Sequence, residues 1–224
     1  MKRPNYSQFC GVACALDLIG DRWTLLVVRE LLFGAKRFTD LLEGLPGIGT
    51  NTLTTRLTEL EENGLVARKR LPAPLAATVL ELTERGQKLE SVLVELARWG
   101  TTPLLTKRPR HGLRPAWLGL ALRSYYDEAG ARGRRIRIAL TLGKGALQLE
   151  LGRGPLRIAE GEPSEPPELR ITAKEHVLLD VFRGALSVAA AKRNQELLVE
   201  GDATLLPRLL AAFPIRADVA QVAE

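Results

Sequence analysis

The chain has few cysteines, histidines and aromatic residues for its length. Two cysteines and two histidines stand among 224 residues, and Phe, Trp and Tyr together make up 5%. Two thiols without a third or fourth ligand make a poor zinc site, so we expect no metal. His111 and His176 lack any recognisable partner motif. We therefore expect both to be surface or linker residues, and we expect no enzyme.

Long apolar runs are also missing. No run approaches the ~20 residues that a membrane-spanning helix needs. The opening residues, MKRPNYSQFC, lack the apolar segment of a signal peptide, so we expect a cytoplasmic protein. The glycines between Gly143 and Gly154 do not have the spacing of a phosphate-binding loop or a dinucleotide-binding turn. The sequence therefore predicts no cofactor.

The overall composition is that of an ordinary soluble globular protein, with 46% apolar and 26% charged residues. Its length allows one large domain or two small ones. The formal net charge is +6 and the sequence pI is about 9.6. This balance favours a polyanionic partner without identifying one.

The most distinctive segment runs from Arg37 to Glu84. RFTDLL predicts a short helix capped by Thr39, LPGIG a turn, and Thr50–Asn63 a second helix that ends before a glycine. A strand, LVARKRL, a loop tip, PAPLA, and a return strand at 77–82 follow. A hairpin that follows a helix-turn-helix has the geometry of a wing. Two further helices, one at Val12–Ile19 and one in RWTLLVVRELLFG, precede this segment.

The second helix of this pair has an unusual polar face. Leu53, Leu57 and Leu60 recur at the spacing of one buried stripe. The opposite side carries short hydrogen-bonding side chains, although Lys and Glu are better helix formers than Thr. Such a face suits close approach to base edges in a DNA major groove, since Asn can pair with adenine and Thr offers a hydroxyl and a methyl. An exposed face with no binding role is the alternative.

The residues that we predict to contact DNA lie on this helix and in two basic segments. Asn51 and Thr55 are the predicted base contacts, and Arg56 could instead pair with a glutamate. The basic residues could equally be solvated surface cations. The full predicted set is Lys36, Arg37, Thr50, Asn51, Thr52, Thr54, Thr55, Arg56, Thr58, Arg68, Lys69 and Arg70.

A long helix follows Thr83, which we expect to cap it. Its apolar stripe, Leu89, Val92, Leu93, Leu96 and Trp99, is longer than one small domain can cover, so a partner subunit is predicted. A Pro-punctuated stretch then separates two domains. We place a DNA-binding and dimerisation domain at 1–104, a linker at 105–115 and a second domain at 116–224.

The second domain begins with a predicted helix at 116–129. RIRIALTL, ALQLELG and PLRIAEG then alternate apolar and polar residues, which predicts an antiparallel meander with one buried face. SEPPELRIT adds a strand, and helices near 174–182 and 186–192, a strand at 197–200 and a last helix capped by Asp202 complete it. The predicted fold class is α+β.

The first hundred residues closely resemble the HxlR family of winged-helix transcriptional regulators. The shared phrases are IGDRWTLLVVRELLFG, RF-x-DL, LPGI, L-x-x-RL-x-ELE-x-x-GLV and LTERGQKL. The resemblance implies a dimeric DNA-binding repressor or activator. Some members sense oxidants or electrophiles through a cysteine near the N-terminus, a position that Cys10 matches and Cys14 does not. Two small buried apolar residues are the alternative interpretation of this cysteine pair. The uncharged tip PAPLAA departs from the family, which favours Arg68, Lys69 and Arg70 as the phosphate contacts.

The second half resembles the sterol-carrier-protein-like fold through RIRIALTLGKGALQLELGRGPLRI, PELRITAKEHVLLDVFRGALSVAAA and LLVEGDATLLPRLLAAF. That fold encloses an apolar cavity which can hold lipids. We therefore expect a homodimeric, sequence-specific transcriptional regulator, a repressor, controlled by a small hydrophobic ligand or by Cys10. One alternative is a lipid carrier in which the winged helix mainly dimerises. In another, the second domain is only structural.

Overall fold

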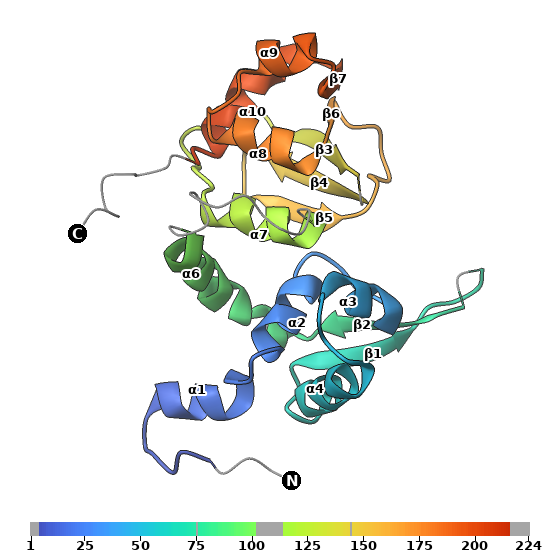
Figure 1. Ribbon diagram of the computed structural model, residues 1–224, viewed down its shortest axis with the longest axis vertical. Helices are drawn as coiled ribbons and strands as arrows, with labels where there is room; N and C mark the ends of the chain where they lie inside the picture. Colours follow the sequence, from blue (N-terminus) through green and yellow to red (C-terminus); the bar gives the residue numbers. More distant parts are fainter. Residues whose placement is uncertain (1–4, 75, 102–113, 144, 216–224) are drawn as a thin grey trace. The chain divides into compact units, whose positions relative to one another are not determined.

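The computed structural model describes residues 5–74, 76–101, 114–143 and 145–215. The chain divides into two compact units, Met1–Leu93 and Val94–Glu224 (Figure 1). The division falls inside one helix, α6 (Leu89–Thr101). Most of the predicted linker lies on residues 102–113, outside the described residues. Its last residue, Pro115, opens a helix of the second unit.

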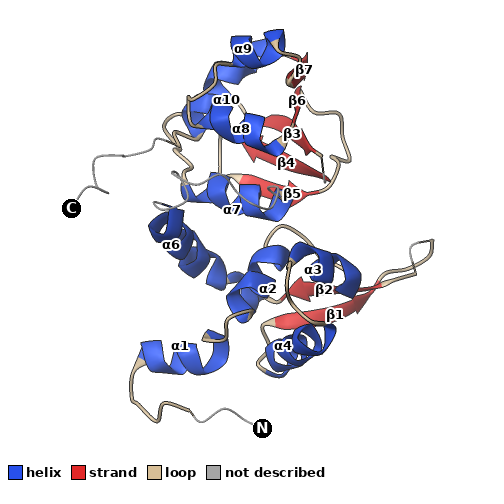
Figure 2. Ribbon diagram, in the orientation of Figure 1, coloured by secondary structure: helices blue, strands red, loops and turns tan. Residues whose placement is uncertain are grey.

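The first unit contains four helices, a hairpin and a fifth short helix. The helices are α1 (Gly11–Ile19), α2 (Thr24–Leu31), α3 (Phe38–Gly44) and α4 (Thr50–Glu62). Strands β1 (Val66–Arg70) and β2 (Thr78–Leu82) form the antiparallel hairpin, which α5 (Glu84–Gln87) follows (Figure 2). A bridge from Lys36 to Leu80 attaches the segment between α2 and α3 to the hairpin. The predicted order of elements is confirmed as far as the hairpin.

The core of the first unit is largely aliphatic and draws mainly on α2, α3, α4 and the hairpin. Burying one such side chain stabilises the fold by roughly 1.5–3 kcal/mol. The fully or nearly fully buried members are Val27, Val28, Leu31, Leu41, Leu45, Leu53, Leu57, Leu60, Leu65, Val66, Val79 and Leu80. The stripe predicted on α4 is therefore the face by which this helix packs.

Two local predictions about helix ends were wrong. Thr39 does not cap α3, because Arg37 occupies the cap position and its backbone N–H donates to Asp40 Oδ2 at 2.9 Å. The first-turn Asp40 thus accepts from the N–H of the cap residue, whereas we had expected the threonine hydroxyl to accept from a first-turn N–H. Thr83 does cap a helix, accepting from the Gly86 N–H at 3.1 Å. That helix is the short α5, however, and α6 starts separately after Lys88.

Helix α5 is held against the end of α4 by hydrogen bonds to carbonyls that the helix leaves unpaired. The Thr83 hydroxyl donates to the Gly64 carbonyl at 2.6 Å, and Arg85 donates to the Asn63 carbonyl at 2.8 Å. Gly86 lies so close to β1 that an added Cβ would stand 2.0 Å from the Leu65 carbonyl oxygen. The absence of a side chain at Gly86 is therefore a condition for this packing.

The second unit is a five-stranded sheet with helices. After α7 (Pro115–Ser124) come β3 (Ile136–Leu142), β4 (Gly145–Leu151), β5 (Arg157–Glu160) and β6 (Leu169–Ala173). Helices α8 (Glu175–Phe182) and α9 (Val188–Arg193), strand β7 (Leu197–Gly201) and α10 (Leu206–Ala212) complete it. A 3₁₀ turn, Ala203–Leu205, leads into α10, with Asp202 accepting from the Thr204 N–H as its cap. The predicted α+β class is confirmed.

Helix α7 is shorter than predicted, because it ends at Ser124 rather than near Ala129. After it, the Asp127 N–H donates to the Ala212 carbonyl at the end of α10. The Ser124 carbonyl accepts two hydrogen bonds from Arg98, at 3.1 Å from Nε and 2.9 Å from Nη2. These tertiary partners bring the chain out of the helix, and none of them is visible in the local sequence pattern.

The strand order is β5-β4-β3-β6-β7. The predicted meander is confirmed, since β3 pairs antiparallel with β4, and β4 with β5. Strand β6 pairs parallel with β3, so residues 161–168 carry the chain from one edge of the sheet to the far side of β3. Alternation predicted the faces of the strands correctly, but it does not determine which strands become neighbours.

One face of the sheet is apolar and the other polar. Ile138, Leu149, Ile158 and Ile171 lie on the buried face, whereas Arg137, Glu150 and Arg170 alternate with them. The aromatic part of the core centres on Phe213, with ring centroids 5.7 Å from Tyr126 and 6.0 Å from Phe182. None of the helices in the described ranges combines the length and the hydrophobicity that a membrane span requires.

Ion pairs attach the connection 161–168 to the polar face. Glu162 pairs with Arg170 at 2.8 Å, and Glu165 pairs with Arg137 at 2.9 Å. Glu168 pairs with Arg134 and accepts from the Arg137 N–H at 2.9 Å. Partial burial acts to raise the pKa of Glu168, but the bonds from Arg134 and Arg137 outweigh it and lower that pKa. This carboxylate thus stabilises the connection above its ordinary pKa, and the contribution is lost as the pH falls through the lowered value.

Candidate nucleic-acid interface

Helix α4 presents the polar face that its sequence predicted. Leu53, Leu57 and Leu60 are buried, and the side chains opposite them are exposed to solvent. The exposed set is Thr50, Asn51, Thr52, Thr54, Thr55 and Thr58. The helix follows α3 after a short turn and precedes the hairpin, which is the order of a recognition helix and its wing. Contact with bases by these residues stays a prediction.

Two of the threonine hydroxyls are committed to the helix backbone. Thr54 Oγ1 donates to the Thr50 carbonyl, and Thr55 Oγ1 donates to the Asn51 carbonyl, each at 2.9 Å. With its hydrogen used in this way, each hydroxyl offers outward only an acceptor lone pair beside a methyl group. Thr55 is therefore suited to the amino group of adenine or cytosine and to the methyl group of thymine. The tendency of Thr to bond back by one turn could have been read from the sequence.

The N-terminus of α4 is suited to phosphate. Its cap residue is Gly49, which has no side chain to accept from the first-turn N–H groups. The first amides of a helix lack intrahelical partners and carry a partial positive charge, so they favour an anion. Sequence reasoning assigned this end to base contact alone and missed the amides, although a glycine at the cap position was the available signal.

The basic residues of the wing are exposed. Arg68 pairs with Glu61 at 2.6 Å, and Lys69 lies 3.5 Å from Glu81. Arg70 is exposed, and within the described residues it has no ion-pair partner. Arg37 is also exposed, at the start of α3. Exposed ion pairs are worth only ~0–1 kcal/mol, so a DNA phosphate could displace these glutamates.

Lys36 and Arg56 are placed differently. The side chain of Lys36 is 11% exposed and lies 3.4 Å from Glu30, a carboxylate that is itself buried. Arg56 is 12% exposed and lies 2.5 Å from Glu59 and 3.6 Å from Asp21. The structure thus contains the glutamate pairing that was the alternative for Arg56. DNA contact by Lys36 and Arg56 stays a prediction.

Both cysteines are exposed, so the interpretation of the pair as buried apolar residues was wrong. The four-residue spacing does not place both on one helical face, because Cys10 is the extended residue before α1 and only Cys14 lies in the helix. Cys10 occupies the cap position of α1. The first backbone amides of α1, those of Ala13 and Val12, favour the thiolate and lower the pKa of the thiol, against an opposing effect of burial, although the side chain makes no cap hydrogen bond.

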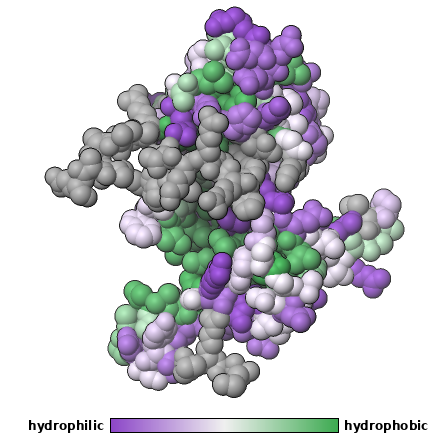
Figure 3. All heavy atoms as spheres, in the orientation of Figure 1, coloured by the Kyte–Doolittle hydropathy of each residue, from purple (hydrophilic) through white to green (hydrophobic). Residues whose placement is uncertain are grey.

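Apolar side chains are exposed on α1 and α6. On α1 and just before it they are Tyr6, Phe9, Val12 and Leu16, and Figure 3 shows apolar surface over this helix. On α6 they are Val92, Leu96 and Trp99. The single chain therefore leaves these three side chains of the predicted α6 stripe exposed to solvent. Clustered apolar surface of this kind is typical of a binding interface.

These features define a winged-helix DNA-binding domain. The second helix of the helix-turn-helix buries a leucine stripe and exposes short side chains, and a basic hairpin follows it in the sequence. The model of the HxlR-like helix-turn-helix family matches residues 18–107. The HTH-type transcriptional regulator YodB of Bacillus subtilis is 39% identical over 85 residues, covering 38% of this chain and 76% of YodB. YvaP of the same organism, an uncharacterized HTH-type transcriptional regulator, is 35% identical over 98 residues, covering 43% of this chain and 91% of YvaP. The chain belongs to the HxlR-like helix-turn-helix family and is a DNA-binding transcriptional regulator.

A third relative, the uncharacterized HTH-type transcriptional regulator sll1512 of Synechocystis sp., is 37% identical over 94 residues. That match covers 42% of this chain and 70% of the relative. The second half resembles another family. The model of the SCP-2 sterol transfer family matches residues 127–213. Both resemblances noted in the sequence are confirmed, and the chain joins an HxlR-like half to a sterol-carrier-like half.

Proposed function

We propose that this regulator is a non-catalytic homodimer whose two α4 helices read an approximately palindromic operator, with Asn51 and Thr55 at the base edges. The observation that carries the proposal is the exposed Asn/Thr face of α4 opposite a fully buried leucine stripe. Phosphate contacts come from the first-turn amides of α4 and from Arg37, Arg68, Lys69 and Arg70. Repression of transcription, rather than activation, stays a prediction.

The exposed apolar side chains of α1 and α6 support the dimer. Removing an apolar side chain from water contributes roughly 1.5–3 kcal/mol, and a two-fold interface would use each of these residues twice. Two recognition helices related by a two-fold axis would enter successive major grooves, about 34 Å apart.

Footprinting on the DNA upstream of the gene, combined with sedimentation, tests this proposal. We expect two protected half-sites one helical turn apart and a dimer in solution. Trp99→Glu should shift the protein toward monomer and weaken operator binding at least tenfold, because a charge would be buried in the interface. Leu198→Glu, at an exposed leucine of β7, is the matched control and should leave both unchanged. A wild-type monomer that gives a single protected site would contradict the proposal.

We further propose that Cys10 is the more reactive of the two thiols and a sensor of oxidants or electrophiles. Its lowered pKa raises the thiolate fraction at neutral pH, and the thiolate is the nucleophile. We expect iodoacetamide to alkylate Cys10 faster than Cys14 at pH 7, with the rate for Cys10 levelling off at lower pH. Mass spectrometry of Cys10→Ser and Cys14→Ser measures each thiol separately. Equal rates and equal pH profiles would remove the support for Cys10.

A hydrophobic ligand in the second domain is also proposed, supported by the SCP-2 match and by the apolar face of the sheet. Native mass spectrometry of the purified full chain tests it. A copurified lipid that changes operator affinity would favour ligand control, and a lipid without such an effect would favour the carrier function. A domain that takes up no lipid would leave it a structural role.

A further inference from the structure

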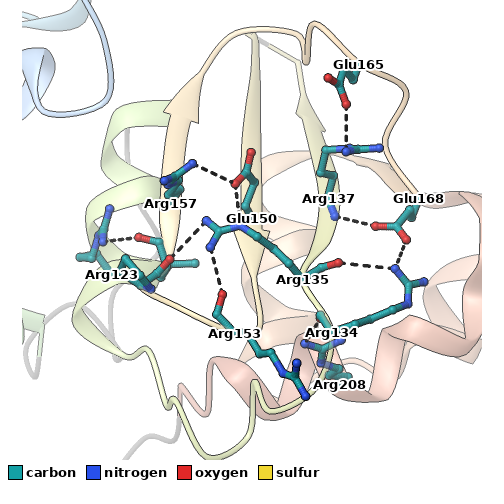
Figure 4. A network of polar contacts seen from close by, with 12 residues as sticks. Arg123, Arg134, Arg135, Arg137, Glu150, Arg153, Arg157, Glu165, Glu168 and Arg208 are labelled. Atoms are coloured by element: carbon teal, nitrogen blue, oxygen red, sulfur yellow. Dashed lines mark hydrogen bonds and ion pairs between the residues drawn. The ribbon is translucent and has the colours of Figure 1, made fainter.

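Arginines from three separate segments gather at one end of the sheet in the second unit. They come from the loop before β3, from the turn between β4 and β5 with the start of β5, and from α10, and Figure 4 shows most of them with their partners. We call this group the arginine corner. It consists of Arg132, Arg134, Arg135, Arg153, Arg157 and Arg208.

Two members of the corner hold its loops together. Arg208 Nη2 donates to the carbonyls of Ala131 and Arg134, each at 2.7 Å. Arg135 donates from Nη1 to the Arg153 carbonyl at 3.1 Å. The loops approach closely, because a Cβ on Gly152 would lie 2.4 Å from the Arg134 carbonyl oxygen. These contacts give the corner a defined geometry.

In the described part of the chain, the corner holds more guanidinium groups than carboxylates that form ion pairs with them. Glu150 pairs with Arg135 at 2.8 Å and lies 3.6 Å from Arg157, and Glu168 pairs with Arg134. Hydrogen bonds from Thr204 lower the pKa of Asp202, and the positive charge of Arg134 lowers it further. Among the described residues, ion pairs thus join only three of the six guanidinium groups, those of Arg134, Arg135 and Arg157, to carboxylates.

Four of the six arginines in the corner are exposed to solvent. Arg134 and Arg157 remain 62% and 71% exposed despite their ion pairs. The side chains of Arg132 and Arg153 are exposed and form no hydrogen bond or ion pair with another described residue, and Arg153 is bonded to Arg135 only through its backbone carbonyl.

A concentration of like charge destabilises a fold by self-repulsion, and an anion relieves that repulsion. Guanidinium groups bind phosphate oxygens through paired N–H donors, more specifically than an ammonium can. A surface with several guanidinium groups on closely packed loops therefore fits a series of phosphates rather than one carboxylate.

We propose that the arginine corner contacts the phosphate backbone of duplex DNA beside the sequence that the winged-helix domain binds. DNA is favoured over other polyanions because the same chain carries a DNA-binding domain. Once that domain is bound, the tethered corner meets flanking phosphates at a high effective concentration. The contact adds affinity without sequence preference and makes binding more sensitive to salt.

The test uses the full chain and two duplexes of upstream DNA, one limited to the footprint and one extended on both sides. The double variant Arg132→Ser/Arg153→Ser removes two exposed charges that hold no loop. On the extended duplex we expect its affinity to fall about tenfold. The slope of log K against log salt should become shallower by about 0.9 for each phosphate that the variant no longer neutralises. On the limited duplex it should match the wild type.

The matched control is Lys192→Ser/Arg193→Ser, which removes the same charge from the exposed end of α9. Thermal melting of both double variants confirms that each is folded. The inference is overturned by an unchanged salt slope in the Arg132/Arg153 variant, or by an equal loss in the control. It is also overturned if that variant loses binding to phosphatidylglycerol vesicles and keeps the wild-type DNA slope. Since the winged helix is measured on the limited duplex, its own failure would be visible separately.

Discussion

Replacing Asn51 and Thr55 together by alanine should weaken binding to the operator roughly 100-fold and leave non-specific DNA binding almost unchanged. A good side-chain contact to a base edge discriminates by about 1–3 kcal/mol, and two such contacts lie on adjacent turns of α4. Because phosphate contacts supply most non-specific affinity, the variant should keep its salt dependence. Fluorescence anisotropy with operator and scrambled duplexes measures both quantities.

Two further variants separate the groups that Thr55 offers. Thr55→Val keeps the bulk and the methyl group but removes the outward lone pair, whereas Thr55→Ser keeps the hydroxyl and removes the methyl group. Loss of affinity in only one of them identifies the group that is read. Glu62→Ala, at the exposed far end of α4, is the control and should bind as the wild type does. Folding should not suffer, since alanine is a better helix former than asparagine or threonine. An unaltered preference for the operator in the double variant would exclude α4 as the reading element.

Replacing Gly86 by alanine should destabilise the first domain by about 2–4 kcal/mol. The new Cβ would stand 2.0 Å from the Leu65 carbonyl oxygen, a backbone atom that cannot rotate away. Either α5 must move off β1 or the hairpin must shift, and each movement breaks the bonds from Thr83 and Arg85 to the end of α4. For a domain of this size the melting temperature should fall by roughly 10–25 °C, which calorimetry can measure.

Gly100→Ala is the matched control for this substitution. Gly100 also lies in a helix, α6, but an added Cβ there meets no atom within 4 Å. Alanine in place of a helical glycine should therefore stabilise the protein by up to ~1 kcal/mol. If both variants melt at the wild-type temperature, the close approach of α5 to β1 is not a constraint on this fold.

Much of the candidate interface was readable from local patterns. The three-and-four spacing of Leu53, Leu57 and Leu60 requires a helix with one buried side, and the same spacing places Asn51 and Thr55 opposite. Alternation in the second half likewise predicted the buried and exposed residues of β3 and β4. These inferences succeed because side-chain direction follows directly from the period of a helix or a strand.

Local patterns failed where a distant partner decides the outcome. The exposure of Cys10 and Cys14, the early end of α7 at Ser124 and the division of the helix after Thr83 all depend on contacts across the fold. The ion pair between Lys36 and the buried Glu30 also depends on such a contact. The sequence immediately around each residue does not predict such contacts.

The sequence by itself determined the class of protein, the buried and polar faces of α4 and the faces of the strands, because periodicity and family phrases are local properties. Only the tertiary structure decided which cations remain exposed, that β6 lies parallel to β3, and that six arginines from three segments form one corner. Those features arise when residues far apart in the chain are brought together. Their energies depend on distance and burial, which a linear sequence does not contain.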